Sequence, residues 1–190
     1  NVWTNPAEVA NGVDDDGNGY VDDIHGWDFY ADDPTVYDGP GDDHGTHVAG
    51  TIGARGGNAI GVAGVAWRVG LIPAKFMGPD FGLTSDAVAA LDYLTALKLS
   101  GGPRIVATNN SWGGPSASPA LLDAIERAGD AGILFVAAAG NDAQNNDAAD
   151  HYPSNFTAAN LVAVAASDAG DNLASFSNYG PDVDLLAPGV

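Results

Sequence analysis

The chain has 190 residues, of which 45% are hydrophobic and 16% are charged, and this composition indicates a folded globular domain with a sizeable core. Asp and Glu number 25 against 6 Lys and Arg, so the formal net charge is −19 at pH 7. That charge excludes nucleic acid and anionic membranes as partners and favours divalent cations. The chain has no cysteine, which excludes disulfides, thiolate metal sites and a cysteine nucleophile. No apolar run is long enough to span a membrane.

The first half of the chain is predicted to hold a long acidic loop region, then a helix and two strands. Residues 1–43 are rich in acidic side chains and lack helical periodicity, which predicts mainly loop structure. The small residues at 44–54 predict a compact helix whose start is capped by Asp42 and Asp43. Two short apolar runs follow and predict buried strands. They cover residues 61–67 and 69–77.

The second half alternates apolar strands with amphipathic helices. Apolar residues at helical spacing predict a helix over 84–99, and Pro119 marks the first turn of another within 118–132. The predicted strands cover residues 104–111, 133–141, 161–167 and 183–189. This alternation predicts an α/β fold with a mainly parallel sheet covered on both faces. In such sheets, functional residues gather at the carboxyl ends of the strands.

Residues 11–25 contain the alternating oxygen-bearing side chains of a calcium loop. Gly19 permits the sharp turn, but His25 stands where an EF-hand has a bidentate Glu. The predicted ligands are the side chains of Asp14, Asp16, Asn18, Asp22 and Asp23, with the carbonyl of Tyr20. In this set, Asp23 replaces the missing Glu. The alternative is an acidic loop closed by Asx-turns without metal.

Two histidines, His44 and His47, lie three residues apart in "GDDHGTHVAGT". The helix of zinc peptidases has its histidines at i and i+4 with a Glu between them, which this stretch lacks. The remaining alternatives from the residues alone are a catalytic base and a helix start at which both rings are hydrogen-bonded.

The surrounding motifs decide between these alternatives. "HGTHVAGTIGA", "NNSWGG", "VAAAGN" and "YPSNF" occur in this order and are followed by "ASFSNYGPDVDLLAPGV". The set resembles the subtilisin-like serine peptidases (subtilases) and covers essentially the whole chain. The resemblance implies a three-layer α/β fold, with residues 1–190 as the central part of a single catalytic domain. The loop at about 11–25 would be an insertion that some members carry.

The resemblance also implies roles for individual residues. His44 matches the general base, His47 a position that supports structure, and Asn141 the side-chain donor of the oxyanion hole. Eight further positions match segments that bind the substrate. They are Ser111, Trp112 and Gly113 on one strand, Ala138, Ala139 and Gly140 on the opposite wall of the S1 pocket, and Gly78 and Gly82 at a second substrate-pairing edge.

A second calcium loop is implied by "RGGNAIGV", which resembles a calcium-binding loop of the family. Its ligands would be the side chain of Asn58 and the carbonyl oxygens of Ile60 and Val62. In the family, other ligands of this site come from segments that precede the equivalent of residue 1, so this chain alone would hold an incomplete site.

Two groups of the serine-peptidase mechanism have no counterpart in the motifs. The family's aspartate lies in "D-[ST]-G" and its nucleophile in "G-T-S-M-A", and neither pattern occurs here. Ser111, Ser175 and Ser177 lack the glycine-flanked setting of a nucleophile. We therefore expect a sequence truncated at both ends, inactive by itself, with apolar faces left uncovered.

The whole protein is expected to be a secreted, calcium-stabilised endopeptidase that acts on polypeptides through an acyl-enzyme and is monomeric at full length. The alternative is a non-catalytic pseudo-peptidase that kept the peptide-binding groove and the calcium sites but lost the chemistry.

Overall fold

The computed structural model describes all residues, Asn1–Val190, and they form two compact units, Asn1–Ala90 and Leu91–Val190. The boundary falls inside helix α2, Thr84–Leu99. None of the helices is both long and apolar enough to cross a membrane. The interpretation of the chain as part of a single catalytic domain stays a prediction.

The first unit is mostly irregular, as its acidic composition predicted. Its regular elements are the parallel pair β1 (Trp27–Asp28) and β2 (Ala74–Lys75), the short 3-10 helix η1 (Pro40–Asp42) and the helix α1 (Asp43–Gly53). The pairing joins segments that are almost fifty residues apart in the sequence. Lys75 of β2 also contacts Asp42, the residue before α1, and so holds the start of this helix near the β1–β2 pair.

The predicted capping of α1 by Asp42 is wrong. Asp42 occupies the N-cap position, but its side chain makes no capping hydrogen bond. Its carboxylate instead accepts from the Asp38 N–H at 2.6 Å and contacts the Lys75 ammonium at 3.2 Å. An ammonium and a backbone donor outside the helix therefore use the oxygens that a cap would need. Asp43 lies inside the first turn.

The strand predicted over residues 61–67 is also wrong. The backbone N–H groups of Gly64 and Val65 donate to the carbonyls of Ala54 and Thr51, so this segment runs back along the end of α1. Its apolar side chains are exposed, with 89% of Val65 accessible. Hydrogen bonds to the helix end take the place of a strand ladder. In the run at 69–77, only β2 forms a strand.

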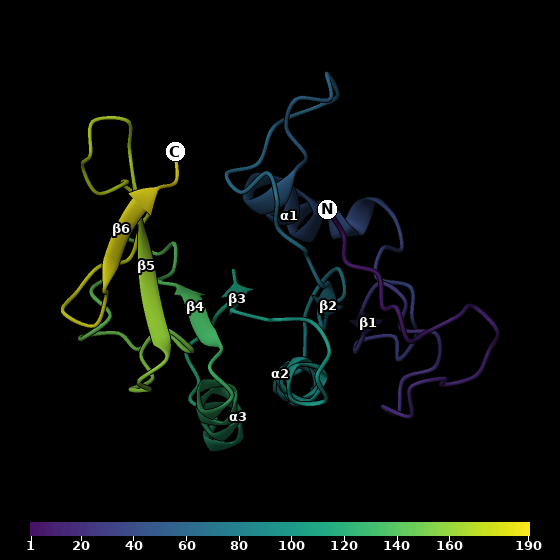
Figure 1. Cartoon of the computed structure of the whole chain (residues 1–190). Helices are drawn as coiled ribbons and strands as arrows, with labels where there is room; N and C mark the ends of the chain where they lie inside the picture. The colour runs from purple at the N-terminus through teal and green to yellow at the C-terminus, as the bar shows by residue number, and fades with distance from the viewer. The chain divides into compact units, whose positions relative to one another are not determined.

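The second unit contains the predicted parallel sheet. Its strands lie in the order β3 (Ala107–Asn110), β4 (Leu134–Ala138), β5 (Leu161–Ser167) and β6 (Leu185–Pro188), all parallel to their neighbours. Figure 1 shows the four strands side by side with their carboxyl ends at one edge. The α/β prediction is confirmed.

Helix α3 (Pro119–Asp130) packs against β4 and forms part of the core. Its N-cap Ser118 accepts a hydrogen bond from the Leu121 N–H, and Pro119 fits the first helical position because it has no N–H to leave unpaired. Ile125 of this helix and Phe135 of β4 are fully buried. The core thus fixes β4 and, with it, the loop that follows β4.

Some apolar side chains of the sheet are exposed. Leu134 of β4 is 49% accessible, and Leu185 and Leu186 of β6 are 57% and 48% accessible. The expectation that truncation leaves apolar faces uncovered stays a prediction.

Candidate active site

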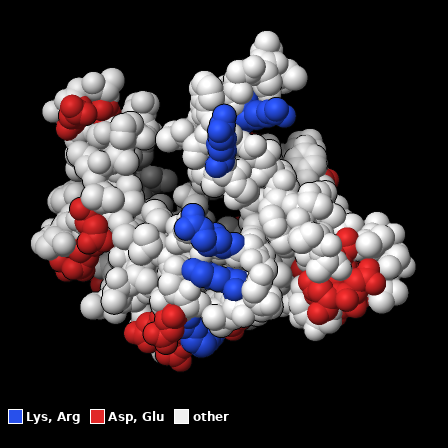
Figure 2. Space-filling view, viewed as in Figure 1, with Lys and Arg blue, Asp and Glu red and all other residues white.

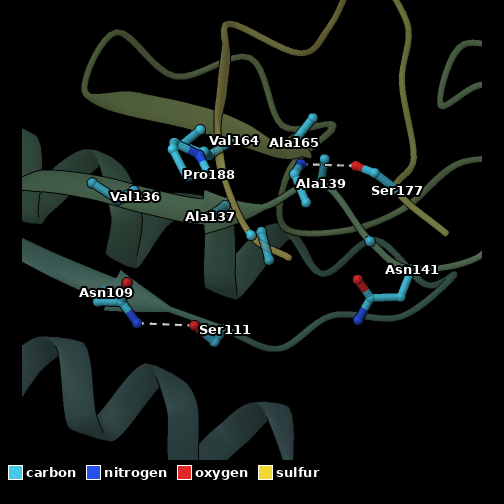
Figure 3. A pocket seen from close by; sticks show the side chains of 15 residues that line it. Asn109, Ser111, Val136, Ala137, Ala139, Asn141, Val164, Ala165, Ser177 and Pro188 are labelled. Atoms are coloured by element: carbon cyan, nitrogen blue, oxygen red, sulfur yellow. Dashed lines mark hydrogen bonds between the residues drawn. The ribbon is translucent and has the colours of Figure 1, made fainter. Parts of the chain in front are cut away.

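A hollow of about 260 Å³ lies at the carboxyl ends of the sheet strands in the second unit (Figure 3). It is where functional residues of a parallel sheet are expected. Of the residues assigned from the sequence, it brings together Ser111, Ala138, Ala139, Gly140 and Asn141. Trp112 and Gly113 follow Ser111 in the chain but do not line the hollow.

Asn141 stands on a sharp turn directly after β4. Gly140 has φ +114°, a conformation that side chains with a Cβ rarely adopt, and this turn ends the strand. Asn141 itself is exposed, and Figure 3 shows its side-chain amide beyond the strand ends, at the rim of the hollow. An amide in this place can donate to an oxygen bound in the hollow.

The turn that carries Asn141 is held by Asn178. The Asn178 N–H donates to the Gly140 carbonyl at 2.9 Å, and its side-chain oxygen accepts from the N–H groups of Asp142 and Gln144 at 2.8 and 3.2 Å. Asn178 therefore fixes the backbone on both sides of Asn141.

A second buried amide extends this support. The Asn178 Nδ2 donates to the Asn146 Oδ1, and the Asn146 Nδ2 donates to the Ala139 carbonyl, each at 2.9 Å. Asn146 and Asn178 are each 1% accessible. The pairing satisfies these polar side chains inside the protein and makes the turn after β4 part of the core.

The strand of the first substrate-binding motif is anchored at both ends. At its start, the Asn109 Nδ2 donates to the Ser111 Oγ at 3.0 Å (Figure 3). At its end, Gly114 and Tyr152 exchange backbone hydrogen bonds of 2.8 and 2.7 Å as an antiparallel bridge. Between them, the Trp112 ring packs edge-on against Phe135, with centroids 6.5 Å apart.

His44 lies in the first turn of α1, in the first unit, with its side chain exposed to solvent. An exposed imidazole at a helix start can exchange protons with a bound group. His47, one turn later, is also exposed, and only its carbonyl is engaged, by the Thr51 hydroxyl at 3.0 Å. The supporting role expected for the His47 ring stays a prediction.

An ion-pair cluster connects the β1–β2 pair to the start of α1. The Lys75 ammonium contacts the carboxylates of Asp28 at 3.0 Å and Asp42 at 3.2 Å, and it also contacts Asp38. Burial lowers the pKa of Lys75, but the three carboxylates outweigh burial and raise it. The Asp38 N–H holds the pKa of the Asp42 carboxyl below its usual value despite partial burial. The cluster fixes the segment from which His44 projects.

Gly78 and Gly82 flank a tight turn. Met77 and Gly82 form an antiparallel bridge, and the Gly78 N–H donates to the Phe81 carbonyl at 2.9 Å. A Cβ at Gly78 would overlap the ring of Tyr30, so this close approach requires glycine. The role in substrate pairing that the resemblance implies for Gly78 and Gly82 stays a prediction.

The acidic loop brings three carboxylates together. One oxygen each from Glu8, Asp14 and Asp16 lie within 4.8 Å of one another. Asp14 and Asp16 were predicted from the sequence, whereas Glu8 was missed because it precedes the EF-like spacing by six residues. The Glu8 carboxylate accepts from the N–H groups of Asp15, Asp16 and Asp22, which closes the loop around it.

The other predicted ligands in the loop have different surroundings. Asp23 is fully buried and accepts from the side-chain amides of Asn5 and Asn18 at 2.8 and 2.9 Å. Asp22 accepts from the N–H groups of Asn11 and Gly12. Tyr20 packs edge-on against Trp27, with ring centroids 5.2 Å apart. These contacts stabilise the loop. The carboxylates that lie close enough together to hold a metal ion are those of Glu8, Asp14 and Asp16.

The second predicted calcium loop is open. Ile60 and Val62 are 75% and 69% accessible, and the Ile60 N–H donates to the Asn58 side chain at 3.1 Å. The loop turns on itself through an Asx-type bond, and no acidic cluster forms there.

A serine and a histidine do meet in the second unit, but not as a nucleophile and its base. His151 Nδ1 lies 2.9 Å from the Ser154 Oγ. The single hydroxyl proton of Ser154 goes to the His151 carbonyl at 2.7 Å, and Ser154 is 2% accessible. Ser177 is equally buried and bonded to the Ala166 N–H. Ser177 lines the hollow, but its hydroxyl has no histidine partner and is held by hydrogen bonds to the backbone at Ala166 and Asn178.

Comparison with known proteins identifies the family. The model of the subtilase family of peptidases matches residues 4–190. The chain belongs to the subtilase family. Its relatives include subtilisin BL of Lederbergia lenta, 40% identical over 163 residues that cover 85% of this chain and 55% of the relative. An extracellular protease of Xanthomonas campestris is 34% identical over 197 residues, covering 87% of this chain and 33% of that protein.

Solved structures agree with this placement among the subtilases. A cold-adapted subtilisin-like serine proteinase matches 86% of this chain and 54% of its own, with a TM-score of 0.68 and 31% identity. A protease of Pseudoalteromonas arctica matches 77% of this chain and 43% of its own, with a TM-score of 0.66 and 37% identity. This subtilase chain spans about half the length, or less, of the curated relatives it matches.

Proposed function

We propose that the protein containing this chain is a serine endopeptidase that cleaves polypeptides through an acyl-enzyme. His44 accepts the proton of the serine hydroxyl as its oxygen attacks the scissile carbonyl carbon, then passes that proton to the leaving amine. Asn141 donates a hydrogen bond to the oxyanion that forms on the carbonyl oxygen. Water then hydrolyses the acyl-enzyme with His44 again as the base.

The observation that carries this proposal is the placement of Asn141. A side-chain amide at the rim of a hollow, on a turn that two buried asparagines hold rigid, is a preorganised donor. Preorganised donors stabilise developing charge because they need no rearrangement at the moment of reaction.

Replacing Asn141 with Ala is expected to lower kcat for peptide hydrolysis by about 100- to 1,000-fold with little change in KM. The lost hydrogen bond acts on the oxyanion and not on the bound substrate, so ground-state binding is kept. Steady-state kinetics on a chromogenic peptide measure both constants. Asn109→Ala is the matched control, because Asn109 lines the same hollow with its amide directed to Ser111. A rise in KM at unchanged kcat would contradict the assigned role.

A fluorophosphonate probe, applied to the protein that contains this chain, distinguishes a peptidase from the alternative. The alternative is a peptide-binding module without catalytic activity. Covalent labelling that a peptide substrate slows supports the peptidase. Peptide binding without labelling supports the binding module.

We also propose that the acidic loop binds Ca²⁺ through Glu8, Asp14 and Asp16. Three carboxylates so close together repel one another, and a hard divalent cation that takes oxygen ligands relieves this repulsion. The Asp and Glu side chains gather in separate clusters on the face shown in Figure 2, rather than spreading evenly. The ion would supply charge neutralisation and tie residue 8 to the loop at 14–16.

Removal of calcium is expected to lower the melting temperature of the purified protein. A ligand at 100 times its dissociation constant stabilises the folded state by about 2.7 kcal/mol. Thermal unfolding in EDTA, in Ca²⁺ and in Mg²⁺ measures the difference. In the variant Asp14→Asn with Asp16→Asn, the three curves should coincide. Equal melting temperatures of the unmodified chain in EDTA and Ca²⁺ would rule the site out.

The remaining parts of the proposal concern location and assembly. Secretion is supported by the extracellular protease among the relatives. A monomeric full-length state and polypeptide substrates are proposed on the family membership.

A further inference from the structure

Two Asn–Gly pairs lie in the acidic loop of the first unit, Asn11–Gly12 and Asn18–Gly19. An asparagine before glycine can lose its side-chain amide in a reaction within the chain, because glycine has no side chain to crowd the approach of its nitrogen to the amide carbon. A Cβ at Gly12 would meet nothing within 4 Å, so the space around this residue is open. The contacts of the two asparagines decide which of them reacts.

The Asn11 amide has the two contacts that promote acyl transfer. Its Oδ1 accepts a hydrogen bond from the Val13 N–H at 2.7 Å. This donor stabilises the negative charge that develops on the oxygen when the amide carbon is attacked. The attacking nitrogen also has a partner, since the Gly12 N–H donates to the two oxygens of the Asp22 carboxylate at 2.9 and 3.2 Å. A carboxylate at this distance is placed to take the proton as the new bond forms.

The leaving nitrogen of Asn11 is held only at the surface. Asn11 and Asp15 are both exposed, and the Asn11 Nδ2 donates to the Asp15 carboxylate at 3.0 Å. Water can replace either partner here, so breaking this hydrogen bond costs little free energy. The nitrogen is therefore free to leave as ammonia.

Asn18 has similar contacts around its carbonyl but not around its nitrogen. Its Oδ1 accepts from the Tyr20 N–H at 2.8 Å, and the Gly19 N–H donates to the Asp14 carboxylate at 2.9 Å. Its Nδ2, however, donates at 2.9 Å to Asp23, which is fully buried. Loss of this nitrogen would take a donor away from a carboxylate that water does not reach. The structure therefore protects Asn18.

We propose that Asn11 is a site of self-catalysed deamidation, with the Val13 N–H as oxyanion donor and Asp22 as proton acceptor. The Gly12 nitrogen bonds to the Asn11 Cγ, and its proton passes to the Asp22 carboxylate. The Cγ–Nδ2 bond then breaks, and the nitrogen takes up this proton through solvent and leaves as ammonia. Water opens the resulting succinimide at one of its two carbonyls, which leaves an aspartate or an isoaspartate at position 11. This inference does not depend on the proposed peptidase function.

The modification changes the contacts of Asp15. It removes the donor from Asn11 and sets a second carboxylate in its place, so that like charges repel each other. Asp15 also accepts from the Val9 N–H at 3.3 Å. The reaction thus loosens the connection between residue 9 and the loop, next to Glu8 of the carboxylate cluster.

The test follows the two asparagines during incubation of the purified protein that contains this chain at neutral pH. Peptide mapping by mass spectrometry measures the mass gain at each position, and ion exchange separates the more acidic product. Asn11 should be converted about 10- to 100-fold faster than Asn18, because the Asn18 nitrogen must first leave a charged, buried partner. Equal rates at the two positions would contradict the assignment.

A synthetic peptide of residues 8–16 is the unfolded reference, since it contains Asn11 and Gly12 but not Asp22. Asn11 should react at least about tenfold faster in the folded protein than in this peptide, because only the fold brings the proton acceptor to Gly12. A slower reaction in the folded protein would show that the loop protects Asn11, and it would overturn the proposal.

Two variants test the residues directly. Asp22→Asn keeps the shape and a hydrogen-bond acceptor but removes the charge, so conversion of Asn11 should fall about tenfold or more while that of Asn18 stays the same. Asn11→Gln cannot close the five-membered ring and should end the mass gain at position 11. Thermal melting checks that both variants fold. An unchanged or faster reaction in Asp22→Asn refutes the role of Asp22, and if this variant does not fold, the comparison with the peptide decides.

Discussion

On the proposed peptidase function, replacing His44 with Ala in the protein that contains this chain is expected to lower kcat for peptide hydrolysis by about four orders of magnitude or more. Without the imidazole, the serine hydroxyl has no group to take its proton, and the remaining catalysis comes from the oxyanion hole and substrate binding. Steady-state kinetics on a chromogenic peptide measure the loss, with the concentration of folded protein in each sample checked by thermal unfolding. Because His44 is exposed, the melting temperature should change little.

The matched control is His47→Ala, one turn further along the same exposed face of the helix start. If the two histidines have unequal roles, this change should lower kcat by less than about tenfold. Similar losses for both variants would contradict the assignment of the base to His44 alone. So would a His44→Ala enzyme that kept a tenth of its activity.

Replacing Asp28 with Ala is expected to destabilise the first unit by about 3 kcal/mol. Asp28 is fully buried, its Oδ1 accepts from the N–H groups of Tyr30 and Ala31, and its Oδ2 contacts the Lys75 ammonium. The change leaves buried donors unpaired and removes one counter-charge of Lys75. Urea unfolding of the purified protein measures the free energy.

Asp38→Ala is the matched control, since Asp38 contacts the same ammonium but its side chain is 49% accessible. Exposed ion pairs contribute about 0–1 kcal/mol, so this variant should unfold near the same urea concentration as the parent. Equal destabilisation by both changes would show that charge alone, and not burial, determines the effect.

Elements whose signals are local could be predicted from the sequence. The bounds of α2 (Thr84–Leu99) and β5 (Leu161–Ser167) match the predicted ranges, and Ser118 caps α3 with Pro119 in the first turn. Helical spacing, an uninterrupted apolar run and a cap residue each lie within a few neighbouring residues. For the same reason, the alternation of strands and helices gave the α/β fold.

Features that depend on distant partners could not be predicted. Asp42 reads as a helix cap until Lys75, 33 residues away, is known to bind its carboxylate. Residues 61–67 read as a buried strand because only the fold shows that their N–H groups bond to the end of α1.

The surroundings of the candidate site could not be predicted either, because they also depend on residues that are distant in the sequence. Glu8 lies outside the spacing that defines the calcium loop, and the position of His151 against Gly113 and Gly140 has no sequence signal. The roles predicted for Asn141 and His44 rest on the resemblance of an ordered set of motifs, whereas the groups that surround them come from segments that only folding brings together.

The buried pair of Asn146 and Asn178 has a consequence for motion on the time scale of hydrogen exchange. The N–H groups of Asp142 and Gln144 belong to a surface turn, yet both are donated to an oxygen that is itself inside the protein. Exchange of these two amides with solvent deuterium then requires opening of the core around β4, not fraying of a loop. The turn should therefore exchange at the slow rate of the sheet, and Asn141 should keep its orientation for as long as the second unit stays folded.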